Sequence, residues 1–249
     1  MKGIYTVVSG AVAQERRLGF ISNNLANALT AGYKSSKPIF EGVLSSSVME
    51  TNTNKEDNTF VGTYESHINF DQGSFADTGS RLDLALQGDG FFVVRTPEGY
   101  RYTRNGQFAL NADKVLVTQS GFPVVGEGGD IVIDGRDVVI EKDGSVLVEK
   151  DGSAKVDRTP AGKLKLVRFA EKEFLRPVGR SLFENVNPEN RELRTEDCSV
   201  NQGYTEASNV EVVKEMLNMI ACMRAYEAYR KVQQTASDMS TKLQEVARS

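Results

Sequence analysis

The chain has 249 residues, of which 39% are hydrophobic and 26% charged, and its formal net charge is −4. This length allows one large domain or a small domain with extensions, and the acidic balance argues against a general binder of nucleic acid. No window approaches the roughly 20 apolar residues that cross a bilayer. A cleaved signal peptide is not expected, because the apolar spacing continues past residues 11–13, the small-residue stretch that resembles a cleavage site.

The first predicted element is a helix over residues 3–30, within an N-terminal region that we bound at 1–35. Its apolar residues recur at alternating intervals of three and four, the spacing of a helix that packs against another helix. Gln14 is the polar exception, and Gly32 stands where such a helix is expected to end. The predicted seam consists of Ile4, Val7, Ala11, Gln14, Leu18, Ile21, Leu25 and Ala28.

A second helix is predicted over residues 209–246, within a C-terminal region bounded at 208–249. This stretch contains neither proline nor glycine, and Ser208 or Asn209 can cap its start. At about 1.5 Å per residue the helix would be about 55–60 Å long, with apolar residues on more than one face.

The middle of the chain has a different period. Between residues 81 and 185, short apolar runs are broken by Gly, Asn-Gly, Asp-Gly or Pro, which predicts a β domain of short strands and tight turns. The polar residues 36–80 are predicted to form a linker or irregular arm, and residues 186–207 a return connection. The predicted fold class is therefore α+β, with the terminal helices forming a coiled-coil-like core beside a central all-β domain.

The two terminal helices predict assembly. Full burial of the first seam contributes about 10–15 kcal/mol, while ordering each residue costs about 1–2 kcal/mol, so the isolated helix is marginal. The longer second helix keeps apolar surface after meeting the first, so we expect contacts with copies of the chain as well as within it. The simpler alternative is pairing inside one monomer. The predicted interface comprises Ile4, Ala11, Leu18, Ile21, Asn23, Asn24, Leu25, Asn27, Ala28, Asn209, Val210, Met216, Met219, Ile220, Tyr226, Tyr229, Val232, Ala236, Met239 and Leu243.

Three asparagines near the end of the first helix, Asn23, Asn24 and Asn27, are unusual because asparagine is a poor helix former. Two interpretations stay open. The amides can bond neighbouring groups in a packed assembly, through both donor and acceptor ends. Alternatively, they only cap or fray the helix before Gly32.

No catalytic, cofactor or metal site is expected. Cys198 and Cys222 lie far apart with no surrounding histidines, so they indicate neither a metal site nor a disulfide scaffold. His67, the single histidine, falls in a strand-like stretch and has no GxSxG nucleophile motif to serve. Gly88 and Gly90 lack the full GxGxxG pattern and indicate a turn between strands.

Three stretches carry a family resemblance. "ISNNLANALTAGYK" (21–34) resembles the N-terminal signature of the flagellar axial family, the rod, hook and hook-associated proteins of bacteria. The stretch that begins "SNVEVVKEMLNMI" at residue 208 resembles the family's C-terminal signature. "LDLALQGDGFFVV" (82–94) and "YTRNGQFALN" (102–111) resemble the central β domain shared by rod and hook subunits.

The resemblance implies a non-enzymatic subunit of the flagellar basal-body rod that transmits torque and lines the export channel. It further implies export through the flagellar type III apparatus without a cleaved signal, and helical stacking into a hollow rod that crosses the periplasm. The expected partners are copies of the chain, other rod subunits and that apparatus, with no nucleic acid, cofactor or small-molecule substrate. The opening residues and modest length favour the proximal rod, and the distal rod or a hook-type subunit is the alternative. A rival from another class is a soluble β-domain binding protein that a coiled coil oligomerises.

Overall fold

The computed structural model describes residues 2–44, 59–135, 137–149, 158–195 and 197–246. The chain divides into two compact units, and neither is a single stretch of sequence. Unit 1 contains the described residues of Met1–Asn27, Ser35–Asn69 and Val210–Ser249, and unit 2 contains those of Ala28–Lys34 and Phe70–Asn209. The chain therefore passes between the units after residues 27, 34, 69 and 209.

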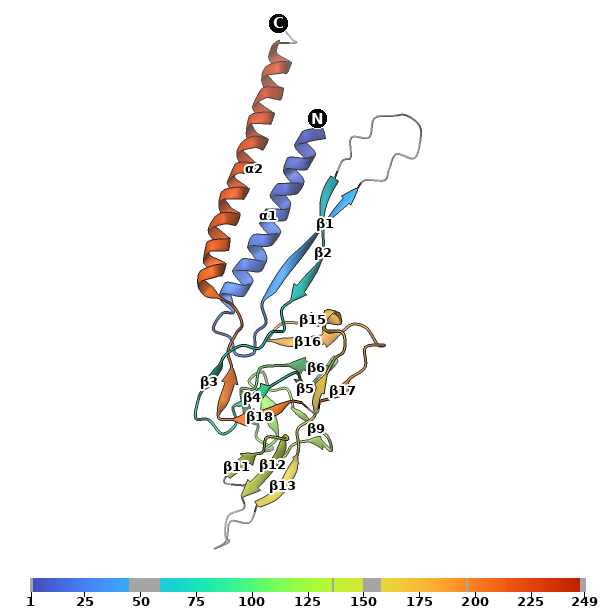
Figure 1. Cartoon of the computed structure of the whole chain (residues 1–249), viewed down its shortest axis with the longest axis vertical. Helices are drawn as coiled ribbons and strands as arrows, with labels where there is room; N and C mark the ends of the chain where they lie inside the picture. The colour runs from blue at the N-terminus through green and yellow to red at the C-terminus, as the bar shows by residue number, and fades with distance from the viewer. Residues whose placement is uncertain (1, 45–58, 136, 150–157, 196, 247–249) are drawn as a thin grey trace. The chain divides into compact units, whose positions relative to one another are not determined.

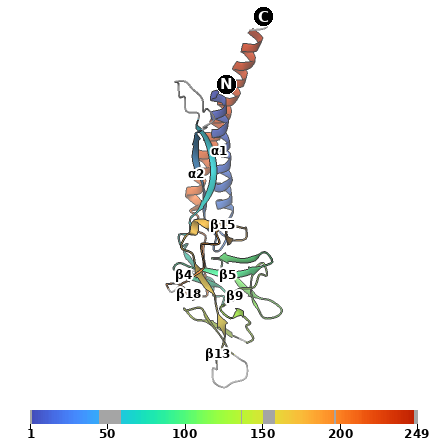
Figure 2. The same cartoon turned by 90° about the vertical axis from the view of Figure 1, so that its right-hand side faces the viewer.

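Unit 1 contains two helices from opposite ends of the chain, α1 (Lys2–Ala26) and α2 (Val212–Val246). They pack against each other (Figure 1 and, turned by 90°, Figure 2). Neither contains proline, so no backbone donor is lost inside either helix. With the β-rich region between them in sequence, the two terminal helices confirm the predicted α+β class.

The end of α1 differs from the prediction, because the helix stops at Ala26 rather than at residue 30. The Asn27 side-chain amide donates to the carbonyl of Asn23 at 2.9 Å, and the Asn27 N–H is shared between the carbonyls of Asn23 and Asn24. A short amide that bonds nearby backbone in this way competes with continuation of the helix. Turns follow as far as Gly32, whose φ of +66° favours glycine.

Residues 36–80, predicted as a linker, contain strands. β1 (Ser36–Leu44) and β2 (Thr59–Ile68) form an antiparallel ribbon with one register shift, and both strands contact α1. The ribbon satisfies its polar backbone through strand pairing, and Ile68 is buried. Part of the predicted arm, residues 45–58, lies outside the described residues.

Unit 2 contains short strands joined mostly by tight turns, as predicted. Its largest sheet has the order β15-β16-β6-β5-β14-β17, and β11-β12-β13 form a second sheet. Asp-Gly pairs were predicted to form tight turns, and Asp143-Gly144 lies in the turn that joins β11 to β12. Gly144 has the positive φ of +84° that such turns use. The strands are β3 (Phe75–Asp77), β4 (Leu84–Gln87), β5 (Phe91–Thr96), β6 (Gly99–Thr103), β7 (Phe108–Leu110), β8 (Leu116–Thr118), β9 (Val125–Gly126), β10 (Gly129–Asp130), β11 (Asp137–Ile140), β12 (Ser145–Glu149), β13 (Arg158–Lys163), β14 (Leu166–Arg168), β15 (Leu175–Pro177), β16 (Leu182–Asn185), β17 (Leu193–Arg194), β18 (Ser199–Gln202) and β19 (Tyr204–Glu206), with a single 3₁₀ turn η1 (Lys172–Phe174).

The core of unit 2 is apolar and aromatic. Phe91 lies at the centre of an aromatic group, with edge contacts to Phe70 and Phe183 at centroid distances of 5.6 and 6.1 Å. Leu84, Phe92 and neighbouring aliphatic residues form a buried cluster that draws on strands from β4 to β18. Unit 2 thus has a hydrophobic core of its own.

Residues 186–207, predicted as a return connection, also contain paired strands. β18 pairs with β4 and β19 pairs with β3, so the last strands of unit 2 bond to its first ones. This closure brings Glu206, at the end of β19, beside residues from near the start of the chain.

Candidate assembly surface

The contact between α1 and α2 uses small and polar side chains. Gly10 of α1 lies against Tyr229, because a Cβ placed on Gly10 would be 2.8 Å from Cε1 of that ring. The Cys222 thiol donates to the Gln14 carbonyl oxygen at 3.1 Å, so the polar position of the predicted seam faces α2. Burial raises the pKa of Cys222, which keeps the thiol protonated in this contact. Ala11 and Ile21 are buried.

The first turns of α2 have a second, exposed face. Val213, Met216, Leu217, Ile220 and Met223 expose 73%, 49%, 63%, 50% and 47% of their surface, respectively. Spacings of three, four and seven place these five residues on one side of the helix, which we name the α2 apolar face.

The opposite side of the same turns is covered. Glu215 and Cys222, seven residues apart, are both buried. The α2 apolar face is therefore not the side through which α2 packs inside the chain. It is a contiguous apolar surface without cover from the described residues, the kind of surface that marks an interaction site.

The predicted interface residues divide by exposure. Ala11, Ile21 and Asn24 are buried inside the chain, whereas Asn23, Met216, Ile220, Val232 and Met239 are exposed. The half-buried ones are Leu18, Leu25, Asn27, Ala28, Asn209, Val210, Met219, Tyr226, Tyr229 and Ala236. The side chains of Ile4 and Leu243 lie outside the described part. Sequence reasoning did not place Val213, Leu217 or Met223 in the interface, although their spacing with Met216 and Ile220 was a usable signal.

The three asparagines occupy different environments. Asn24 is fully buried, donates its amide to the Ser36 carbonyl at 2.9 Å and accepts the Ser36 N–H at 3.0 Å. It therefore ties α1 to the start of β1 through both ends of its amide. Asn23 is exposed, and the Asn27 amide donates to its Oδ1 at 3.3 Å. Any part these residues have in an assembly stays a prediction.

Residues considered for chemistry are dispersed. His67 lies exposed in β2, as expected for a surface residue of a strand. Across the described residues, no three His, Cys, Asp or Glu side chains gather where they could hold a metal ion. Neither α1 nor α2, in its described residues, is apolar enough over a sufficient length to span a membrane.

Together, terminal helices that pack on each other, an intervening β unit and an exposed apolar helix face define an α+β protein with a candidate assembly surface. Three family profiles match parts of the chain. The flagella basal body rod protein profile matches residues 4–34, the flagellar hook protein FlgE/F/G D1 domain matches residues 85–148, and the flagellar basal body rod FlgEFG protein C-terminal profile matches residues 201–246.

Whole proteins are also similar. The basal-body rod protein FlgG of Buchnera aphidicola (from Acyrthosiphon pisum) is 33% identical over 96% of both chains. The rod protein FlgF of Caulobacter vibrioides is 33% identical over 95% of this chain and 94% of its own length. FlgG of Agrobacterium fabrum is 33% identical over 97% of both. The chain belongs to the family of flagellar basal-body rod proteins.

Proposed function

We propose that the chain is a structural subunit of the flagellar basal-body rod that assembles with copies of itself and with other rod subunits through the α2 apolar face. The single observation that carries this proposal is the exposure of five large apolar side chains on the side of α2 that faces away from the intramolecular contact. Membership of a family of structural flagellar proteins supports the same role in motility.

The energetics favour a polymer over a stable dimer. The five side chains are 47–73% exposed, and full burial of a large apolar side chain contributes about 1.5–3 kcal/mol, so covering the face contributes on the order of 4–8 kcal/mol. Association costs about 4–15 kcal/mol in lost translational and rotational freedom, and the ordering of side chains adds to this cost. One such contact is therefore marginal, whereas a subunit with neighbours on several sides adds further contacts for the same loss of freedom.

We place the chain in the proximal rod on its opening sequence; the FlgG of Buchnera aphidicola and the FlgF of Caulobacter vibrioides are each 33% identical to it. The paired α1 and α2 form a coiled-coil-like inner layer around an export channel and transmit torque. The subunit reaches the basal body through the flagellar type III export apparatus without a cleaved signal.

Ile220→Asp tests the proposal, with Ala221→Asp as the matched control. Both positions are exposed in the chain, so both variants should fold. Ile220→Asp places a charge where burial is required for assembly, whereas Ala221→Asp places the same charge on the flank of the α2 apolar face. We expect Ile220→Asp to abolish polymer formation in sedimentation and swimming in a strain that lacks the wild-type protein, while Ala221→Asp retains both. Normal assembly of the Ile220 variant would overturn the proposal.

A further inference from the structure

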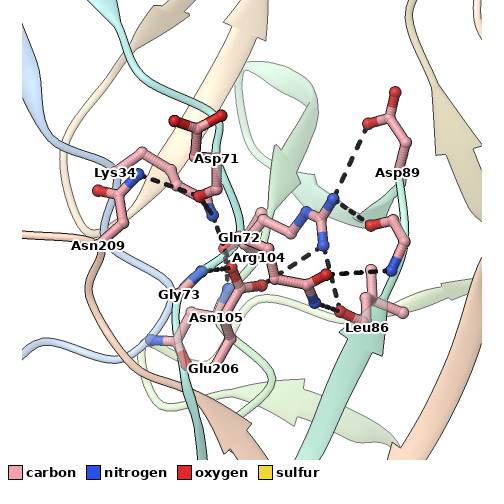
Figure 3. Close-up of polar contacts among 12 residues, drawn as sticks. Lys34, Asp71, Gln72, Gly73, Leu86, Asp89, Arg104, Asn105, Glu206 and Asn209 are labelled. Atoms are coloured by element: carbon pink, nitrogen blue, oxygen red, sulfur yellow. Dashed lines mark hydrogen bonds and ion pairs between the residues drawn. The ribbon is translucent and has the colours of Figure 1, made fainter.

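A cluster of buried charges lies within unit 2. The Glu206 carboxylate bonds Lys34 Nζ through Oε1 at 2.6 Å and Arg104 Nη1 through Oε2 at 3.4 Å (Figure 3). These side chains are only 0%, 1% and 4% exposed, in the order Glu206, Lys34 and Arg104. We name Lys34, Arg104 and Glu206 the boundary cluster.

Other polar groups of the cluster bond backbone groups, whereas Arg104 Nε is buried without a hydrogen-bond partner among the described residues. Lys34 Nζ donates to the Asp71 carbonyl at 2.7 Å, and the Gly73 N–H donates to Glu206 Oε1 at 2.9 Å (Figure 3). Arg104 donates to the carbonyl oxygens of Leu86 and Gly88 at 3.3 and 2.7 Å.

A second carboxylate stands at the edge of the cluster. Asp89 lies 3.9 Å from Arg104 and 2.9 Å from Lys172. Burial lowers the pKa of Lys34, and the charge of Glu206 opposes that lowering. Each buried charge is thus compensated by a partner of opposite sign.

The cluster sits at the places where the chain leaves unit 2. Lys34 is the last residue before one crossing, Asp71 and Gly73 follow another directly, and Glu206 and Asn209 precede a third. Asn209 Nδ2 also donates to the Asp71 carbonyl, at 3.0 Å. The Glu206 carboxylate and the Asp71 carbonyl therefore join three segments that are distant in sequence, those that contain Lys34, Gly73 and Asn209.

Glycines allow these segments to approach closely. The Gly32 N–H donates to the Glu206 carbonyl at 2.7 Å, and a Cβ on Gly32 would lie 2.2 Å from the Asn105 nitrogen. A Cβ on Gly73 would lie 2.0 Å from the Ala207 carbonyl oxygen. No side chain larger than hydrogen fits at either position without backbone movement.

Buried ion pairs are weak contributors to net stability, because desolvation offsets most of the attraction, but loss of one partner is costly. Such a pair is therefore better suited to fixing one arrangement than to stabilising a core. Unit 2 already has its own apolar core around Phe92, and the boundary cluster is polar.

We propose that the boundary cluster is a latch: Glu206 fixes residues 28–34, 70–74 and 204–209 together, so that all three belong to the rigid part of unit 2 and the limits of that unit are set at Lys34, Phe70 and Asn209. The latch acts in a single chain. It goes beyond the proposed function and does not depend on assembly.

Hydrogen exchange of the dilute full-length protein tests the latch. Glu206→Gln removes the charge with little change in shape, takes away the ion-pair partner of Lys34, and leaves Arg104 with Asp89 at 3.9 Å. Exchange in peptides covering residues 28–34 and 70–74 should accelerate at least tenfold, while peptides from β4 and β5 keep the wild-type rate. Lys37→Met is the matched control for Lys34→Met, because Lys37 is exposed while Lys34 is buried. Only Lys34→Met should accelerate the boundary peptides.

Three results would overturn the proposal. Unchanged exchange in the boundary peptides of Glu206→Gln would mean that the cluster does not hold them. Equal acceleration in β4 and β5 would mean that the cluster supports the core instead. The double variant Lys34→Met/Glu206→Gln guards against general misfolding, since it removes a cation and an anion together. We expect exchange in the boundary peptides of the double variant to accelerate by less than the product of the accelerations in the two single variants. An acceleration equal to that product would also refute the latch.

Discussion

Asn24 gives the sharpest prediction about how α1 is held. Asn24→Ala removes two hydrogen bonds to the Ser36 backbone, of 2.9 and 3.0 Å, from a fully buried side chain. At about 0.5–1.5 kcal/mol per bond, the loss is about 1–3 kcal/mol. Alanine regains up to about 0.7 kcal/mol through its higher helix propensity, so the net destabilisation is smaller than the loss of the bonds.

Asn23→Ala is the matched control. It makes the same change of residue type one position earlier on an exposed side chain, and the Asn23 backbone carbonyl still accepts from Asn27. The propensity gain is common to both variants, so their difference reports the Ser36 bonds, less the exposed 3.3 Å bond from the Asn27 amide to Asn23 Oδ1 that Asn23→Ala removes. Urea unfolding of the full chain, followed by the helix signal at 222 nm, should show Asn24→Ala less stable than Asn23→Ala by about 1–3 kcal/mol. A difference below about 0.5 kcal/mol would refute the assignment of Asn24 as the tie between α1 and β1.

The remaining predictions concern a helix contact and the half-buried thiol of Cys198. Gly19→Ala should stabilise α1 by up to about 1 kcal/mol, because no atom beyond the adjacent residues and the backbone of α1 lies within 4 Å of the added Cβ, whereas Gly10→Ala should gain less or lose stability because its Cβ meets Tyr229. Thermal unfolding compares the two, and an equal gain would argue against a close contact at Gly10. Burial raises the pKa of Cys198 to about 11 from an ordinary value of 9, so the unfolded chain ionises first and stability falls as pH rises from 9 to 11. The urea midpoint should therefore fall more between pH 8 and pH 10 for the wild type than for Cys198→Ala. An equal fall in the two proteins would contradict the raised pKa of Cys198.

The parts of the fold that repeat locally were predictable from the sequence. A period of three and four residues identified both helices, and Asp-Gly turns identified the β-rich region, because the forces that favour these elements act between residues close in sequence. The end of α1 was missed because the Asn27 amide bonds within its own turn, which a seam of apolar residues does not report.

Partners that are distant in sequence were not predictable. β19 pairs with β3, more than 120 residues earlier, so residues 186–207 showed no local sign of their place in unit 2. Lys34 and Glu206 are separated by 172 positions, and each resembles an ordinary surface charge until the fold buries it. The exposed residues of the α2 apolar face have a helical spacing that sequence can supply, but which side of α2 the chain itself covers is decided by α1.

The interleaved layout of the two units has a consequence for the order in which they can be completed. If the N-terminus emerges first, unit 2 lacks β19 until residue 206 has emerged, and unit 1 lacks its long helix until the segment Val210–Ser249 has followed. Whichever terminus emerges first, the pairing of α1 with α2 needs both ends of the chain and therefore cannot precede the emergence of unit 2. A truncated product ending before residue 210 would therefore contain a finished β-rich body and a single unmatched helix.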